Sequence, residues 1–225
     1  MEKQFHGQAS ESLRLGLLLA VVGGFLEAYT FLSRGGVFAN CETGNLVLLG
    51  LYLAQGQMVR AMTYLPPILA FFCGVLLTNS IRRRAAFHPR LHWRQITVLF
   101  EAACLAAVAF IPYGRWENIA VTALVSFACS IQVQSFRKVH GSAYATTMCT
   151  GNLRSGTEHL FRWLHHREGT SGRSALVYYG LILSFVAGAV LSGLLTPLFG
   201  TRTVLAACLP LLLSLALMFR LPDPT

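Results

Sequence analysis

Apolar residues along this chain gather into eight stretches, which are separated by short polar connections. A helix needs about 17–25 apolar residues to cross a bilayer, and the stretches lie near that length. The stretches cover residues 13–32, 37–53, 62–81, 95–111, 119–136, 142–161, 176–199 and 203–221. No linker is long enough to separate two domains, so the pattern predicts a single all-α membrane domain spanning residues 1–225.

Two of the eight stretches are interrupted by polar residues. In 37–53 the polar positions leave an uninterrupted apolar run only over 46–53, which makes about 12 Å of helix. The stretch 142–161 carries Arg154 and Glu158 together with several threonines. Lipid does not satisfy such groups, so both stretches must be shielded by protein or line a polar cavity.

The two interrupted stretches share a sequence. Thr43-Gly44-Asn45-Leu46 recurs 107 residues later as Thr150-Gly151-Asn152-Leu153. Each copy lies in the one interrupted stretch of its half of the chain, which favours an internal duplication. The predicted repeats cover approximately 13–112 and 117–221.

Basic residues indicate how the two repeats are oriented. The chain has 18 Lys and Arg against 9 Asp and Glu. In a soluble domain this excess would suggest nucleic-acid binding, but in membrane proteins basic residues collect in cytoplasmic loops. If the two interrupted stretches do not cross the membrane, 13 basic residues lie on one side of it and 4 on the other, with Arg154 inside. If all eight stretches cross, the two sides hold 9 and 8 basic residues. Six spanning helices with cytoplasmic termini are therefore predicted, and three crossings per half invert the second repeat.

Each interrupted stretch predicts a strand followed by a half-helix. The runs 37–39 and 144–147 contain the aromatic and β-branched residues that suit extended backbone. Thr43 and Thr150 are suitable N-cap residues for the helices that follow. Two half-helices that begin near the bilayer midplane would direct unpaired N–H groups toward each other, which is an arrangement that attracts anions.

Several of these residues resemble a known family. Gly24-Phe25-Leu26-Glu27-Ala28, then Gly36-Val37-Phe38-Ala39-Asn40, then Thr43-Gly44-Asn45 are similar to the YoaK-like family of bacterial integral membrane proteins, a domain-of-unknown-function family. The resemblance covers most of the chain and implies a six-span protein of the bacterial inner (plasma) membrane, with no established substrate. An acidic residue near Glu27 fits the family pattern, whereas Glu42 departs from it. The architecture also resembles that of SulP and uracil-permease transporters, without similarity of sequence.

These patterns select three groups of candidate site residues. The expected substrate-binding residues are Thr43, Gly44, Asn45, Thr150, Gly151, Asn152 and Arg154. Burial of a carboxylate favours its neutral form and allows proton exchange, so Glu27, Glu42 and Glu101 are candidates for proton coupling. Supporting polar groups are expected from Asn40, Gln132 and Gln134.

Each group also has a structural alternative. Arg154 either binds an anionic ligand or pairs with Glu158 one turn later on the same helix. The three glutamates either exchange protons or form fixed hydrogen bonds, and the asparagines either contact a solute or hold the interrupted stretches together.

Inverted repeats with broken helices at the midplane are typical of secondary transporters. The sequence therefore favours a transporter or facilitator of a small polar solute, with anions preferred. The alternatives are an intramembrane enzyme, for which no catalytic motif is found, and a non-transporting scaffold or sensor. No CxxC pair or histidine ligand spacing predicts a metal or other cofactor. The expected partners are the solute, the lipid bilayer and a second copy in a homodimer.

Overall fold

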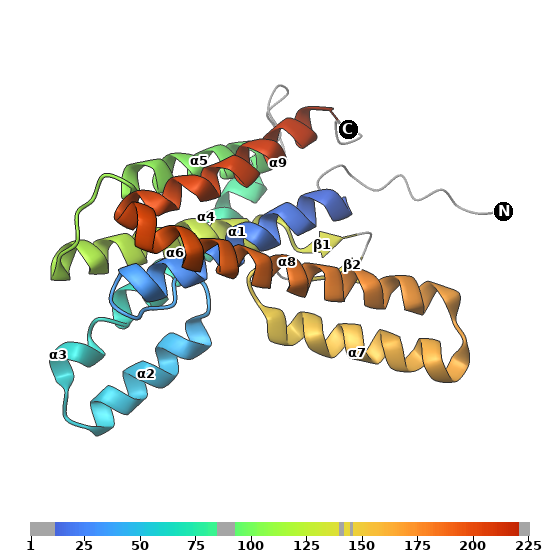
Figure 1. Ribbon diagram of the computed structural model, residues 1–225, viewed down its shortest axis with the longest axis horizontal. Coiled ribbons are helices and arrows are strands. Elements are labelled where there is room, and N and C mark those ends of the chain that lie inside the picture. Colours follow the sequence, from blue (N-terminus) through green and yellow to red (C-terminus); the bar gives the residue numbers. More distant parts are fainter. Residues whose placement is uncertain (1–11, 85–92, 140–141, 145, 221–225) are drawn as a thin grey trace.

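The computed structural model describes residues 12–84, 93–139, 142–144 and 146–220, and these are almost entirely helical (Figure 1). The helices are α1 (Leu13–Ser33), α2 (Glu42–Ala54), α3 (Met58–Ala61), α4 (Leu65–Arg84), α5 (Trp93–Val108), α6 (Arg115–Ser135), α7 (Cys149–His166), α8 (Gly169–Phe199), the 3₁₀ helix η3 (Gly200–Ala207) and α9 (Cys208–Arg220). Each of the eight apolar stretches contains a helix. The last stretch is divided between η3 and α9, and α8 begins seven residues before its apolar run.

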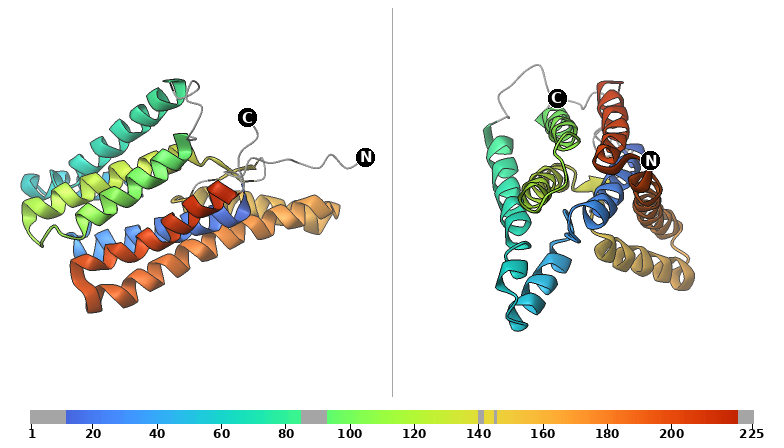
Figure 2. Two further views of the ribbon diagram at one scale, coloured as in Figure 1. Left: turned by 90° about the horizontal axis from the view of Figure 1, so that it is seen from above. Right: turned by 60° about the vertical axis from the view of Figure 1, so that its left-hand side comes forward.

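The helices α1, α4, α5, α6, α8 and α9 follow one another with alternating direction along the molecule. In Figure 1, α1, α5 and α8 run from right to left, and α4, α6 and α9 run from left to right; the views in Figure 2 agree. The helices α2 and α7 begin near the middle of the molecule and run toward opposite ends of it. Two segments lead into them, and their described residues are not helical. Residues 34–41 are here called the first interruption, and the described residues of 136–148 (136–139, 142–144 and 146–148) the second interruption.

The three most extensive helix pairs are α1 with α8, α4 with α6, and α7 with α8. Glycine allows the first two pairs to approach closely. A Cβ added to Gly188 of α8 would lie 2.0 Å from the Val21 oxygen of α1. A Cβ added to Gly74 of α4 would lie 1.8 Å from the Ser130 Oγ of α6 and 2.8 Å from the Phe127 oxygen.

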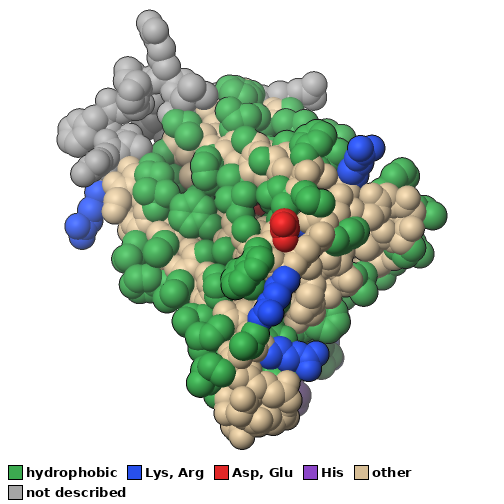
Figure 3. Space-filling model, turned by 90° about the vertical axis from the view of Figure 1, so that its left-hand side faces the viewer, with side chains coloured by type: hydrophobic (Ala, Val, Ile, Leu, Met, Phe, Trp, Pro, Cys, Tyr) green, Lys and Arg blue, Asp and Glu red, His purple; other side chains and the backbone are tan. Residues whose placement is uncertain are grey.

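The outer surface is apolar to a degree that water would not tolerate. Leu176, Leu198, Phe110 and Trp116 each expose more than 70% of their surface, and Figure 3 shows hydrophobic side chains over one end of the molecule with few charges among them. Four helical stretches of the described chain are long and apolar enough to cross a membrane. They are Leu13–Ser33, Met58–Arg83, Arg115–Ser135 and Gly169–Phe219, and the last contains both α8 and α9.

The local structure predicted for the interruptions is wrong in two respects. The runs 37–39 and 144–147 form no strand at their described positions; the only β pairing in the described chain joins β1 (Lys138–Val139) to β2 (Ser142–Ala143). Thr43 and Thr150 are not N-caps, because α2 begins at Glu42 after Cys41 and α7 begins at Cys149 after Met148, and neither cap residue forms a side-chain capping bond. In the first interruption, buried side chains pair the backbone of Phe38 and Asn40 in place of a neighbouring strand.

Candidate polar site at the two interruptions

The two interruptions meet at Gly23 in the middle of α1. Asn40 of the first interruption donates from Nδ2 to the Gly23 oxygen at 2.9 Å. From the second interruption, the Thr146 oxygen and the Thr147 methyl group would lie 2.7 and 3.1 Å from a Cβ at Gly23. A side chain at this position would therefore separate two segments that lie more than 100 residues apart in sequence. The thiols of Cys41 and Cys149, which flank the starts of α2 and α7, are near enough to interact electrostatically.

Glu27, one turn along α1 from Gly23, holds the backbone of the first interruption. Its Oε2 accepts a hydrogen bond from the backbone N–H of Asn40 at 3.1 Å. Asn40 is fully buried and also approaches the Cys129 thiol of α6 at 3.8 Å. Its side-chain oxygen, Oδ1, is buried without a hydrogen-bond partner among the described residues. This leaves a free acceptor directly beside a buried carboxyl group.

Asn45 and Glu42 fasten the start of α2. The Asn45 amide pairs with both backbone groups of Phe38, accepting from its N–H at 3.0 Å and donating to its oxygen. Asn45 also donates to Glu42 Oε2 at 2.9 Å, and the Ser126 hydroxyl of α6 lies 2.7 Å from Glu42 Oε1. The interruption is thus paired by a side chain in place of a neighbouring strand, which explains why it is not a strand.

Glu101 links α5 to the second interruption through Gln132 of α6. Glu101 is 1% exposed and Gln132 is equally buried. With its amide nitrogen directed at the carboxyl group, Gln132 donates to Glu101 at 3.0 and 3.1 Å and accepts from Thr146 Oγ1 at 3.0 Å. This orientation satisfies both ends of the amide.

The three carboxyl groups share one neighbour. Cys129 on α6 is within electrostatic reach of Glu27, Glu42 and Glu101, and it lies on the same face of the helix as Ser126 and Gln132. No Lys or Arg forms an ion pair with these carboxyl groups in the part of the chain that the structure describes. The buried centre is therefore rich in carboxyl groups, and we call it the acidic centre.

The other predicted residues lie outside this centre or at its edge. Thr43, Thr150, Gly151 and Arg154 are exposed, and Asn152 is buried on α7. The Gln134 amide points away from the centre and donates to Asn79 of α4 at 2.7 Å. The local pair expected between Arg154 and Glu158 does not form, since Glu158 pairs instead with Arg162.

Sequence reasoning missed a buried cation at one end of the bundle. Arg34 is 0% exposed and stands beyond the carboxyl end of α5, where its guanidinium donates to the Ile111 oxygen at 2.9 Å and the Pro112 oxygen at 3.0 Å. It also donates to the Tyr29 hydroxyl, which in turn donates to the Thr201 oxygen. A cation at a helix carboxyl end is favoured by the helix dipole. Arg34 therefore joins three connections of the fold and stands apart from the acidic centre.

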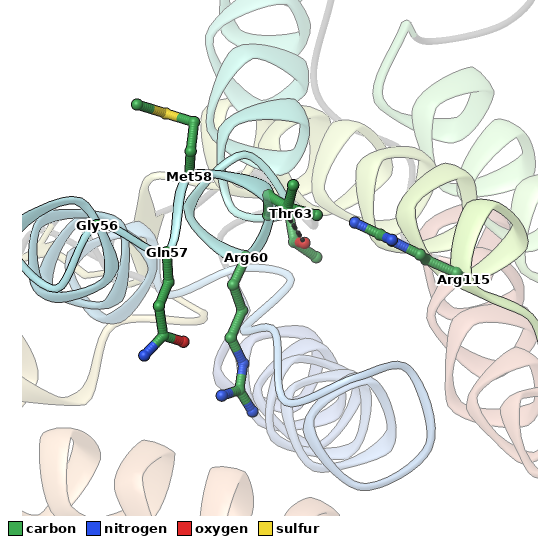
Figure 4. A pocket seen from close by; sticks show the side chains of 7 residues that line it. Gly56, Gln57, Met58, Arg60, Thr63 and Arg115 are labelled. Atoms are coloured by element: carbon green, nitrogen blue, oxygen red, sulfur yellow. Dashed lines mark hydrogen bonds between the residues drawn. The ribbon is translucent and has the colours of Figure 1, made fainter.

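Two pockets open beside the carboxyl end of α2. One, of about 490 Å³, is lined by Gly56, Gln57, Met58, Val59, Arg60, Thr63 and Arg115 (Figure 4). The second, of about 400 Å³, shares Arg60 and Thr63 with it. In Figure 4 the Arg60 and Arg115 side chains do not converge, and the Arg60 guanidinium lies over the Tyr52 ring at 4.9 Å. A third pocket, of about 480 Å³, lies on α7 and is lined by Thr150 and Arg154 among others.

Apolar helices with an exposed apolar surface and a buried polar centre define a multi-pass membrane protein. The model of the family described as "Protein of unknown function (DUF1275)" matches residues 15–217, so the chain belongs to this family. The chain is 28% identical over 189 residues to the UPF0700 transmembrane protein YoaK of Bacillus subtilis (strain 168), a match that covers 80% of this chain and 82% of that protein. No solved structure matches the chain. The resemblance inferred from the sequence is thereby confirmed.

Proposed function

We propose that this protein is a secondary transporter or facilitator of a small polar solute in the bacterial plasma membrane. Its halves would be inverted repeats with six crossings and cytoplasmic termini, and the solute would bind where the two interruptions meet at Gly23. The observation that carries the proposal is this meeting of two broken segments inside a bundle of membrane-length helices. Irregular backbone at membrane depth is tolerated where protein buries it or where it lines a polar cavity, and it marks the solute site in many transporters.

The packing of the helices supports the inverted repeat. In an inverted repeat, α1, α2, α4 and α5 of the first half correspond in order to α6, α7, α8 and α9 of the second. The contact of α1 with α8 then has its equivalent in the contact of α6 with α4, and the contact of α1 with α9 in that of α6 with α5. All four contacts are present. Phe71-Phe72-Cys73-Gly74 resembles Phe185-Val186-Ala187-Gly188 after an insertion of seven residues. Gly74 and Gly188 press onto α6 and α1 respectively. Inversion is also supported by the opposite directions of α2 and α7 in Figure 1.

Unpaired oxygens lie at equivalent places in the two interruptions. The repeat offset equates Asn40 with Thr147, and the side-chain oxygens of both, Asn40 Oδ1 and Thr147 Oγ1, are buried without a described hydrogen-bond partner. A buried polar atom without a partner costs about 1–3 kcal/mol. A solute that donates hydrogen bonds to these oxygens would recover that free energy.

The hydrogen-bonding groups of the centre set the class of solute. The two free oxygens accept hydrogen bonds, and Glu27, Glu42 and Glu101 all lie within electrostatic reach of Cys129, so a solute with hydrogen-bond donors and a neutral, zwitterionic or positive charge fits better than an anion. Glu27 is the favoured proton-coupling residue, because its carboxyl group accepts the backbone N–H of Asn40, the residue that carries the free oxygen. Gain and loss of a proton at Glu27 would change how that backbone is held.

Transport can be tested with purified protein in proteoliposomes under an imposed pH gradient. The solutes would be an amine, a neutral amide, an amino acid and a small carboxylate. We expect uptake of at least one of the first three. Replacement of Glu27 by Gln keeps the side-chain shape and an acceptor for the Asn40 N–H but removes the titrating proton. A lost charge-assisted contact of about 1.5–3 kcal/mol corresponds to a fall in uptake of roughly tenfold or more.

Two control variants make the result specific. Glu117→Gln alters an exposed carboxyl group at the start of α6 and should leave uptake unchanged. Arg154→Gln should also have little effect, because Arg154 is exposed on α7. Uptake of the carboxylate that depends on Arg154 and not on Glu27 would overturn the proposed site. Folded protein that moves none of the four solutes would favour a scaffold or sensor, and turnover of a substrate would favour an enzyme.

A further inference from the structure

One face of α7 is exposed within the described chain, except that the Thr157 hydroxyl at its edge lies 3.3 Å from the Tyr179 hydroxyl of α8. The helix packs on α8 through its opposite side, where Gly156 lies against Tyr178 and Trp163 lies over Gly172. The exposed face forms the pocket of about 480 Å³. Its residues are spaced by three and four positions and all line this pocket: Thr150, Leu153, Arg154, Thr157, Glu158 and Phe161. We refer to these six residues as the outer face of α7.

The outer face carries charge at a depth where lipid would not tolerate it. Gly156 lies at the level of Tyr178, and the apolar run of α8 begins just before it at Leu176. Because α7 and α8 are antiparallel (Figure 1), Arg154 lies still further along this apolar run. Charged side chains within a membrane face protein or a water-filled space. The outer face of α7 therefore needs a cover that the described part of this chain does not supply.

We propose that a second copy of this chain covers the outer face of α7 in a two-fold symmetric dimer. The outer face carries a cation and an anion one turn apart, which makes it complementary to itself. Arg154 has no ion-pair partner among the described residues, and the Glu158 carboxylate, bonded to Arg162, retains acceptor sites for another donor. A surface that pairs with its own copy is what a two-fold interface requires.

The geometry of the dimer is set by the membrane. Both copies insert in the same orientation, so the two-fold axis runs along the membrane normal and the two α7 helices lie side by side in parallel. Identical residues then lie at the same level, and each Arg154 side chain reaches about 6 Å along the interface to the partner's Glu158, with the reverse pair formed by symmetry. Leu153 and Phe161, both about half exposed in the single chain, would enclose the charges and exclude lipid.

Reciprocal charge reversal tests this pairing. Arg154→Glu places like charges opposite each other in its own dimer, and Glu158→Arg does the same with cations. Each variant alone should lose at least about 90% of the dimer, since removing a buried charge pair is strongly destabilising. When the two variants carry different tags and are expressed together, opposite charges face each other again, and the tagged chains should copurify as a heterodimer from mild detergent. Arg173→Glu, at an exposed position outside the outer face, should dimerise as the parent does.

A disulfide experiment gives an independent result in native membranes. Thr157→Cys, near the proposed axis, should form a crosslinked dimer on mild oxidation, and Leu183→Cys on the exposed side of α8 should not. Both are made with the exposed Cys73 replaced by Ser. Three results would each overturn the proposal, whatever the flux measurements show. They are a monomeric parent protein, single charge reversals that dimerise normally, and a mixture of the two variants that fails to form the heterodimer.

Discussion

The helices α2 and α7 occupy equivalent places in the two halves of the chain but are held by different means. α2 has one buried residue, Asn45, and is fastened at its start by polar contacts to the first interruption and to α6. α7 is longer and lies along α8, with Gly156 and Gly172 allowing close approach and with the His159 ring stacked on Tyr178 at 5.7 Å. The helix α2 is therefore held at one end, whereas α7 is held along its length.

This difference shows how a duplicated element can diverge without losing its position. Both helices begin near the place where the interruptions meet at Gly23, so their starting points are the shared feature. Beyond these starting points the two helices differ: α2 exposes mainly leucines and valine, whereas α7 exposes an arginine, a glutamate and threonines beside apolar residues such as Leu153 and Phe161. We infer that lipid covers α2 and that protein covers α7.

The largest effect should come from the glycines that set the two main helix contacts. Gly188→Ala would push a methyl group onto the Val21 oxygen of the α1 backbone, which cannot move aside. We expect the free energy of unfolding to fall by about 3 kcal/mol or more. At Gly74 the nearest atom is the Ser130 hydroxyl, which can rotate away, and the nearest backbone atom, the Phe127 oxygen, lies at 2.8 Å instead of 2.0 Å. Gly74→Ala should therefore cost about half as much. Equilibrium unfolding in mixed micelles measures both, and equal losses would show that the halves are packed alike.

An intermediate loss of stability is expected when the polar contacts at the start of α2 are removed. Asn45→Ala leaves the backbone N–H and oxygen of Phe38 without their partner, which should lower the free energy of unfolding by about 2–3 kcal/mol. The matched control is Asn79→Ala, which removes only the exposed bond to Gln134 and should cost about 0.5 kcal/mol or less. If Asn45→Ala proved as mild as its control, α2 would be held by contacts other than its polar start.

The smallest change in the free energy of unfolding should have opposite signs in the two halves of the chain. Gly44 and Gly151 are the middle residues of the two Thr-Gly-Asn copies. A Cβ at Gly44 would lie 2.5 Å from the Phe38 ring, which must shift, whereas a Cβ at Gly151 meets nothing within 4 Å. Gly44→Ala should therefore destabilise by about 1 kcal/mol, and Gly151→Ala should stabilise by about 0.5–1 kcal/mol through its higher helix propensity. Thermal unfolding of the two variants side by side would reveal the sign.

The sequence was sufficient to locate the interruptions, because polar residues within apolar runs have few structural explanations. It also identified Glu27, Asn40 and Asn45, which the structure places at or beside the meeting of the two segments. The predicted strands were wrong, since propensity does not reveal that the Asn45 side chain pairs the Phe38 backbone. Helical geometry alone could have separated Gln132 from Gln134, because residues two apart on a helix do not share a face.

Arg34 shows what a single sequence cannot supply. Its partners at the end of α5 lie more than 70 residues away, and no motif joins them. Its position after an apolar stretch and before two glycines is typical of an exposed loop. Its burial results from how α1 and α5 end at the same level, which is a property of the assembled bundle.

The orientation of the two halves can be measured directly by the accessibility of single cysteines. Arg83→Cys near the end of α4 and Arg167→Cys between α7 and α8 are exposed positions in the two halves. In a background with the exposed Cys73 replaced by Ser, each is treated in intact cells and in inverted vesicles with a reagent that does not cross membranes. Six crossings with inverted repeats predict that both cysteines react only in inverted vesicles. Reaction of the two cysteines from opposite sides would contradict the inverted arrangement and the solute site built on it.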